Sequence, residues 1–252
     1  MSIRVTIYNE YVGEKNKEQA RALYPDGLHM AIKAYLDKNP DMEVTTVTFE
    51  MPECGLTEEL LNNTDVLIWW GHGRHEGVPD EAVARVVKRV WNGMGFIPLH
   101  SSHMSKPFRA LMGTSCRLRW CEGQKEILWT VLPAHPIAKG IPEYIELEAE
   151  EMYGEPFWVP APEEVVFMGW FNNGNVFRSG MTYRRNNGRI FYFQPGHETN
   201  PSFNNPHILK IIENAVYWAN TGFALKPLPE TGAEYKFPGD TIDMSKYLQA
   251  KE

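Results

Sequence analysis

Short apolar segments alternate with amphipathic segments of helical spacing through the first hundred residues. The apolar segments are rich in Val, Ile and aromatic residues and end at turn residues, which is typical of buried strands. The pattern predicts strands at 3–8, 44–49, 66–70 and 96–99, helices at about 26–39, 57–61 and 81–91, and a polar loop at 9–16. Strands that alternate with helices form parallel sheets, because each helix packs back on the sheet in a right-handed crossover. The chain is therefore predicted to be an α/β protein with a mainly parallel central sheet.

From about residue 127 the pattern changes to shorter, aromatic strands joined by tight turns. Strands are predicted at 127–132, 144–147, 165–170, 176–182 and 189–193, followed by a last helix at 207–219. The turns at 172–175 and 186–188 are rich in Asn and Gly, which tolerate the positive φ of hairpin turns. These strands should extend the sheet as antiparallel hairpins. We assign residues 1–222 to a single domain and 223–252, which are polar and punctuated by proline, to a C-terminal tail along the surface.

The composition argues against several classes of function. The 252 residues carry a net charge of -7 without a sustained Lys or Arg cluster, so no nucleic-acid partner is expected. No apolar run approaches the roughly 20 residues that span a bilayer, and the chain opens on a strand instead of a leader. We therefore expect a cytoplasmic protein with no membrane partner. Cys54, Cys116 and Cys121 form no C-x-x-C pair and are expected to be reduced.

Histidines follow three of the predicted strands. They are His72 after 66–70, His100 and His103 after 96–99, and His197, beside Glu198, after 189–193. His29 lies in the first turn of the helix predicted at 26–39, which should begin at the same edge of the sheet. In open parallel sheets the ligand crevice lies outside the carboxyl ends of the strands. The sequence therefore predicts a functional site at this edge.

Six segments stand in an order typical of one protein family. They are 65–72 (DVLIWWGH), 93–100 (GMGFIPLH), 135–142 (HPIAKGIP), 150–154 (EEMYG), 188–198 (GRIFYFQPGHE) and 214–219 (NAVYWA). Together they resemble the trehalose-utilisation (ThuA-like) family of the class I glutamine amidotransferase-like superfamily, over roughly residues 3–220. The resemblance implies a flavodoxin-like three-layer sandwich. It also implies a cytoplasmic protein of carbohydrate metabolism, acting on trehalose or related glycosides alongside dehydrogenases that make 3-keto sugars.

One departure from the superfamily pattern concerns the nucleophile. After the strand equivalent to 96–99 the amidotransferases carry a cysteine between glycines, whereas this chain has His100-Ser101-Ser102-His103. Neither an imidazole nor an unactivated hydroxyl replaces a thiolate in attack on an amide. A glutaminase is therefore not expected, although His197-Glu198 lies where the superfamily has its catalytic histidine.

The candidate site residues fall into three groups. The catalytic candidates are His197, Glu151, His100, Ser101 and Glu198, the substrate-binding candidates are Trp70, His72, Tyr153 and Trp170, and the metal ligands are His29, His103 and His197. Imidazole and carboxylate groups suit zinc or manganese, and the same groups can move a proton next to a ketone. Aromatic faces stack on the C–H surfaces of sugars. No nucleotide cofactor is expected.

Three hypotheses follow for the function. The first is metal-assisted or His/Glu acid–base hydrolysis or isomerisation of a (keto-)glycoside. The second is a serine hydrolase in which Ser101 or Ser102 attacks, His197 is the base and Glu198 orients it. The third is a non-catalytic sugar-binding or regulatory protein. All three have a small sugar as partner, and exposed aromatic hairpins would also suit a homo-oligomer.

Overall fold

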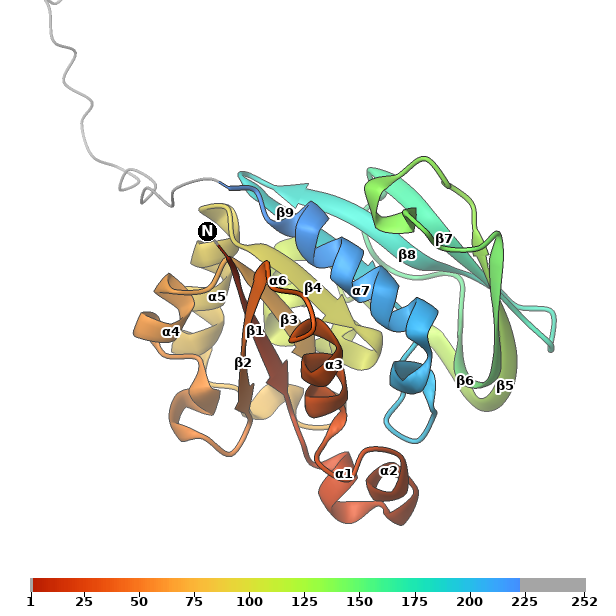
Figure 1. The fold of residues 1–252 in the computed structure, drawn as a ribbon, viewed down its shortest axis with the longest axis horizontal. Coiled ribbons are helices and arrows are strands. Elements are labelled where there is room, and N and C mark those ends of the chain that lie inside the picture. The colour runs from red at the N-terminus through yellow and green to blue at the C-terminus, as the bar shows by residue number, and fades with distance from the viewer. Residues whose placement is uncertain (1, 223–252) are drawn as a thin grey trace, which may run out of the picture.

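The computed structural model describes residues 2–222, in which nine strands form one mixed sheet (Figure 1). The strands are β1 (Ile3–Asn9), β2 (Met42–Thr48), β3 (Val66–Trp70), β4 (Gly95–Leu99), β5 (Arg119–Thr130), β6 (Tyr144–Gly154), β7 (Glu164–Phe171), β8 (Val176–Arg185) and β9 (Gly188–Phe193). Across the sheet their order is β2-β1-β3-β4-β9-β8-β7-β5-β6. The predicted α/β class is confirmed.

The first five strands in this spatial order, β2-β1-β3-β4-β9, form the parallel half of the sheet. β1 pairs with β2 and β3, and β4 pairs with β3 and β9, all in parallel. The order is that of a flavodoxin-like sheet, 2-1-3-4-5, with β9 in the fifth place. Alternate residues of β3 point to opposite sides: Ile68 and Trp70 pack in one apolar core, and Leu67 and Trp69 in the other. Every residue of β3 and β4 is therefore buried, which explains their continuous apolar sequences.

Helices cover both faces of this parallel half. α3 (Leu28–Leu36) and α7 (Pro206–Ala219) contribute to one core, and Figure 1 shows α7 crossing the sheet on the same side as α3. α4 (Glu58–Asn62), α5 (Asp80–Trp91) and α6 (Lys106–Met112) contribute to the other core. The result is the predicted three-layer sandwich. Within residues 2–222, no helix combines the length and the apolar composition that crossing a membrane requires.

The other half of the sheet is antiparallel, through the pairs β9–β8, β8–β7, β7–β5 and β5–β6. The predicted hairpin extension is thereby confirmed, with positive φ of 83° at Gly174 and 53° at Asn186 in its two turns. The pairing of β5 with β6 shifts register around Gln124. Beyond this irregularity β6 is buried from Glu150 to its end, and alternation between exposed and buried residues stops. The end of β6 is therefore enclosed on both faces, beside the carboxyl ends of the parallel strands.

Some predicted boundaries are wrong. The predicted loop at 9–16 contains α1 (Gly13–Asn16), and α2 (Glu18–Leu23) follows it directly. Both helices are too short for an apolar repeat and have no side-chain N-cap, so the usual sequence signals are missing. α3 begins at Leu28, since Gly27 has a φ of 95°. The three cysteines are free, as predicted, and the predicted tail at 223–252 lies outside the described residues.

Candidate active site

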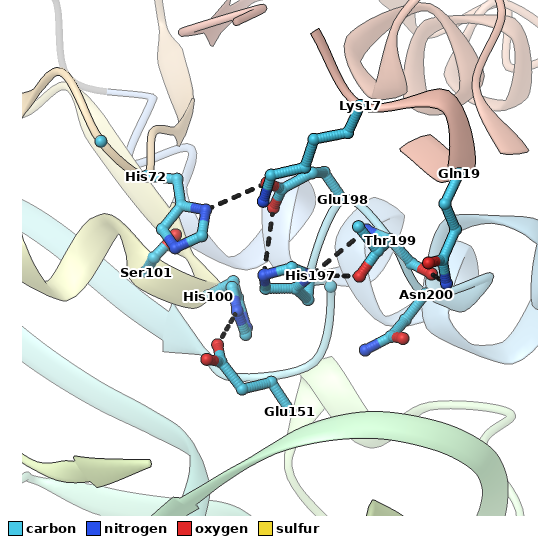
Figure 2. A network of polar contacts seen from close by, with 12 residues as sticks. Lys17, Gln19, His72, His100, Ser101, Glu151, His197, Glu198, Thr199 and Asn200 are labelled. Atoms are coloured by element: carbon cyan, nitrogen blue, oxygen red, sulfur yellow. Dashed lines mark hydrogen bonds and ion pairs between the residues drawn. The ribbon is translucent and has the colours of Figure 1, made fainter. Parts of the chain in front are cut away.

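Three histidines lie together at the carboxyl edge of the parallel strands (Figure 2). His72 follows β3, His100 follows β4 and His197 follows β9. Because β3, β4 and β9 are parallel neighbours, their ends meet at one place. The ring of His197 packs edge-on against both other rings, with centroids 5.0 Å from His72 and 5.3 Å from His100. Glu198, next to His197, and Glu151, from β6, complete the group.

His100 and Glu151 form a buried pair. The backbone of His100 has a φ of 49°, which residues with a side chain seldom adopt. Its Nδ1 donates to the carbonyl of Gln194 at 2.7 Å, and this bond directs Nε2 toward Glu151 Oε2, 2.8 Å away. Burial by itself would lower the pKa of His100, but the hydrogen bond and charge of Glu151 raise it overall. His100 likewise lowers the pKa of Glu151 in spite of burial, so the pair is an imidazolium beside a carboxylate.

Glu198 is held through only one of its oxygens. Oε1 accepts hydrogen bonds from Lys17 Nζ at 2.8 Å and from His72 Nδ1 at 3.1 Å. Burial would raise the pKa of Glu198, but the hydrogen bond and charge of His72 bring it far below its ordinary range. Oε2 lies 3.4 Å from Nε2 of His197. Neither of these two atoms has a hydrogen-bond partner in the described part of the chain.

His197 is a neutral imidazole in this setting. Burial, followed by the nearby charge of His100, lowers its pKa to about 4. Its Nδ1 lies 2.7 Å from the hydroxyl of Thr199 and accepts a hydrogen bond from the backbone N–H of the same residue at 3.2 Å. Its Nε2 points toward Glu198 (Figure 2). A neutral ring can act as a base or as a metal ligand, whereas a charged one can do neither.

The two short helices α1 and α2 cover one side of this group. Lys17 reaches Glu198, and Gln19 donates to the carbonyl of Thr199 at 2.8 Å. A Cβ at Gly13 would lie 2.7 Å from Cγ of Glu198, so the backbone of α1 packs directly on that side chain. Sequence reasoning missed Lys17, because a lone lysine in a polar segment carries no signal of a partner far along the chain.

A cleft of about 430 Å³ opens beside the histidines. Its lining comprises His72, His75, Ser101, His103, Met104, Arg117, Leu118, Trp120, Glu122, Glu151 and Tyr153. Tyr153 stacks on the ring of His100, and its hydroxyl lies 3.2 Å from Nε2. The volume falls within the range of small-molecule sites. Trp120, which is 62% exposed, is a cleft residue that was not among the sequence candidates, although its place at the start of an aromatic strand could have suggested it.

The predicted metal ligands His29 and His103 do not join His197. Nδ1 of His29 lies 2.8 Å from Nδ2 of Asn9, and Nδ1 of His103 donates to the carbonyl of Cys116 at 2.7 Å. Burial lowers their pKa values to about 4 and about 3. Neither belongs to a group of three ligand atoms within 4.8 Å among residues 2–222. The predicted set is not assembled, because local partners already occupy these rings; His103 lines the cleft as a neutral side chain.

Two of the predicted substrate-binding residues, His72 and Tyr153, line the cleft, and two do not. Trp70 is fully buried, and its indole N–H donates to the carbonyl of Gly196 at 2.9 Å. Trp170 is 46% exposed but lies on β7, paired with Val176, and is not part of the cleft wall. Sequence shows that an aromatic residue lies near a strand end, whereas the packing of the sheet decides which face it joins.

Ser101 lies at the cleft, but within residues 2–222 its hydroxyl has no histidine partner of the kind a nucleophile needs. Its hydroxyl donates to the carbonyl of Gly71 at 2.8 Å. A serine nucleophile has its hydroxyl hydrogen-bonded to a histidine, which removes the proton during attack. The observed bond points the Ser101 proton away from such a base, and this disfavours the Ser-His-Glu hydrolase.

A second pair of acidic residues, Glu126 and Glu150, is buried behind the site. Gln194 Nε2 donates to the carbonyl of Glu151 at 3.0 Å, so the Gln194 oxygen faces Ser179 Oγ, 3.0 Å away. Ser179 Oγ also lies 3.1 Å from Glu126 Oε1. One hydroxyl proton cannot serve both oxygens at once, and a protonated Glu126 would resolve this by donating to Ser179 Oγ. Burial and then the charge of Glu150 raise the pKa of Glu126 well above its ordinary value, in agreement.

Replacing Glu126 with Gln is expected to reduce the loss of stability at alkaline pH. Because the pKa of Glu126 is raised in the folded state, the folded protein keeps a proton that the unfolded chain releases above about pH 4.3. The stability contributed by this proton is complete below that pH and declines as the pH rises toward the folded pKa. Glutamine has nearly the same shape as glutamate and keeps a hydrogen-bond donor, but it does not titrate, so its contribution to stability does not decline with pH. Melting temperatures at pH 5 and pH 8 should therefore differ less for Glu126→Gln than for the wild type; equal differences would mean that Glu126 is ionised when folded.

Comparison with known proteins gives one family and several structures of the same fold. Residues 4–219 match the ThuA family, described as trehalose utilisation. A ThuA-like protein from Parabacteroides merdae is similar with a TM-score of 0.67 and 17% identity, over 91% of this chain and 94% of that one. A cytoplasmic protein from Salmonella typhimurium has a TM-score of 0.58 and 13% identity, over 86% of this chain and 98% of that one. A glutamine amidotransferase from Thermotoga maritima has a TM-score of 0.50 and 10% identity, over 88% and 99% of the two chains. A search of curated proteins finds no match.

Proposed function

Because the chain belongs to the trehalose-utilisation (ThuA) family, we propose that it is an enzyme acting on a (keto-)glycoside, moving a proton at the carbon next to a ketone. The products would be an isomerised sugar or, after loss of the glycosidic group and addition of water, the hydrolysed glycoside. The compartment we propose is the cytoplasm, in keeping with the description of the similar Salmonella protein.

The observation that carries the proposal is the position of Glu151. Its carboxylate lines the cleft, while His100 holds it from behind at 2.8 Å. The lowered pKa of Glu151 keeps it ionised at neutral pH, so that it can accept a proton from a bound sugar. His100 is fixed in turn by the carbonyl of Gln194. A carboxylate oriented in this way, at the wall of a cleft of suitable size, is the arrangement expected of a general base.

The proposed step begins when Glu151 removes the proton from the carbon next to the ketone. The electron pair of the C–H bond forms a C=C bond, and the ketone oxygen takes the negative charge. Return of the proton to a different carbon or face isomerises the sugar. Departure of a glycosidic oxygen from the adjacent carbon, together with a proton, cleaves the glycoside. The donor for these protonations is the Tyr153 hydroxyl, which lines the cleft 3.2 Å from Nε2 of the buried His100.

The test uses proton exchange, which detects the first step even when later steps are slow. The protein is incubated in D₂O with a 3-keto glucoside, and deuterium at the carbon next to the ketone is followed by NMR together with release of the glycosidic group. We expect incorporation or release faster than in buffer alone, and none with the parent glucoside, which has no ketone. Saturable binding of the keto sugar with neither exchange nor product would reject the enzyme and favour a sugar-binding or regulatory protein.

Trp120→Ala is expected to weaken binding of the sugar without slowing the chemical step. Stacking on an aromatic ring contributes about 0.5–1.5 kcal/mol, so KM should rise by roughly 2- to 13-fold while kcat stays within about twofold. Steady-state kinetics of both proteins provide the measurement. Trp158→Ala is the matched control, because Trp158 is also 62% exposed but does not line the cleft. Equal effects of the two substitutions would show that Trp120 does not contact the sugar.

A further inference from the structure

We infer that His72, His197 and Glu198 bind one divalent transition-metal ion, with zinc as the best match, next to the Glu151–His100 pair. This inference deepens the proposed function and rests on it for its role: the ion would bind the sugar oxygen at the site where Glu151 removes the proton. Three features of the side chains support the binding itself: ligand atoms without a hydrogen-bond partner, hydrogen bonds that orient the ligands, and an opening to the cleft.

Two buried ligand atoms face each other without any other partner. Nε2 of His197 and Oε2 of Glu198 are 3.4 Å apart, and neither forms a hydrogen bond to the described residues. Both side chains are only 1% exposed, so bulk water does not reach them freely. A tetrahedral ion about 2.1 Å from each of two ligands separates those ligands by about 3.4 Å. One cation between these atoms would therefore satisfy both.

The other polar atoms of these two side chains, Oε1 of Glu198 and Nδ1 of His197, have hydrogen-bond partners, as is usual for the non-coordinating atoms of metal ligands. Oε1 of Glu198 accepts from Lys17 and His72, which leaves Oε2 free to point at an ion. In this structure Nδ1 of His197 accepts a hydrogen bond from the backbone N–H of Thr199 at 3.2 Å; when an ion binds Nε2, the ring proton would move to Nδ1, where Oγ1 of Thr199, 2.7 Å away, can accept it. Metal-ligating histidines typically donate their other ring N–H in this way.

His72 supplies the third ligand and connects the site with the cleft. His72, His197 and Glu198 each offer one ligand atom, and these three atoms lie within 4.8 Å of one another. The side chain of His72 is 36% exposed and lines the cleft. Two histidines with one carboxylate leave a fourth position open, as in catalytic zinc sites. That position would face the space that a sugar enters.

A second group, His100, Glu151 and His197, also brings three ligand atoms within 4.8 Å. His100 already uses both ring nitrogens, one toward the carbonyl of Gln194 and one toward Glu151. We therefore assign the ion to the first group and leave His100 and Glu151 to proton transfer. An ion that binds the ketone oxygen would stabilise the negative charge that forms when Glu151 takes the proton.

The experiment measures metal binding without any sugar. Protein purified without a histidine tag is stripped with EDTA and titrated with ZnCl₂, and separately with MnCl₂, by isothermal titration calorimetry. We expect about one equivalent of zinc to bind to the wild type, at least 100-fold weaker binding for Glu198→Gln, and unchanged binding for His207→Gln, which removes an exposed histidine on α7. Absence of zinc binding to the wild type, or equal binding to Glu198→Gln, would overturn the inference.

Two further measurements keep the test decisive if Glu198→Gln does not fold. Thr199→Val should weaken zinc binding by about 10- to 100-fold, since it removes the hydroxyl that would accept the Nδ1 proton of a metal-bound His197. Cobalt added to the stripped wild type should give the visible absorption of a tetrahedral site, and an octahedral spectrum would contradict the assignment. The results distinguish failure of the metal site from failure of the proposed reaction. Zinc binding without deuterium exchange rejects the proposed reaction only. Deuterium exchange by a protein that binds no zinc rejects the metal site only.

Discussion

Glu151→Gln is expected to lower kcat for the keto sugar by about 10²- to 10⁴-fold, the usual contribution of a general base, with little change in KM. The amide has nearly the same shape but cannot accept the proton. It also removes the charge that holds His100 as an imidazolium, because the two groups lie 2.8 Å apart in a buried pair. Steady-state kinetics and the rate of deuterium exchange in D₂O provide the measurements, and both should fall together.

The control for this substitution is Glu148→Gln, which changes a glutamate on the same strand whose side chain is 79% exposed. It should leave kcat within about twofold of the wild type. Breaking a buried ion pair can cost about 3–5 kcal/mol of stability, so the melting temperature of Glu151→Gln must be measured as well. A folded Glu151→Gln protein with more than about a third of the wild-type kcat would show that another group is the base.

Trp70→Ala is expected to destabilise the fold by about 3–5 kcal/mol, because truncating a fully buried tryptophan leaves a large cavity. The substitution also leaves the carbonyl of Gly196 without its indole donor, next to His197. Free energies of unfolding from urea titrations provide the measurement. If any activity survives, kcat should fall more than KM rises, because the loop that carries His197 loses a support.

Trp170→Ala provides the contrast, since both tryptophans satisfy the same sequence criterion of an aromatic residue at a strand end. Trp170 is 46% exposed, so its replacement should cost below about 1 kcal/mol and leave KM unchanged. A rise in KM for Trp170→Ala at unchanged stability would mean that the sugar reaches β7, and that the cleft beside His72 is not the whole binding site.

The edge of the sheet at which the site lies could be predicted because it follows from local pattern. The apolar runs that become β3, β4 and β9 are each followed within a few residues by a histidine. Parallel strands place their carboxyl ends together, so the proximity of His72, His100 and His197 could be predicted without knowledge of side-chain packing. The predicted metal ligands His29, His103 and His197 required more, because the rule gives the edge of the sheet and not which side chains meet there. His103 also follows β4, and His29 lies in the first turn of α3, yet Cys116 and Asn9 engage their rings.

The buried acids show a different limit of the sequence. Glu150 and Glu151 are adjacent in β6, and strand alternation would send them to opposite faces, one of them toward solvent. Both are buried, because Glu150 packs against Gly196 and Ser202 while Glu151 packs against His100. Glu126 lies in a strand that begins with mostly exposed residues, and it is nevertheless fully buried, which raises its pKa well above the ordinary value. Their protonation states depend on neighbours that are distant in the sequence.

The sequence by itself determined the α/β class, the change from parallel to antiparallel strands and the edge that carries the histidines. These properties follow from signals that are local in the sequence: the periodicity of apolar residues and the residue types at the strand ends. Only the tertiary structure decided that Glu198 meets Lys17 and His72, that Glu151 pairs with His100, and that Trp70 is a core residue. The physical reason is that these contacts join residues 51 to 181 positions apart, so they exist only once register and packing place the strand ends side by side.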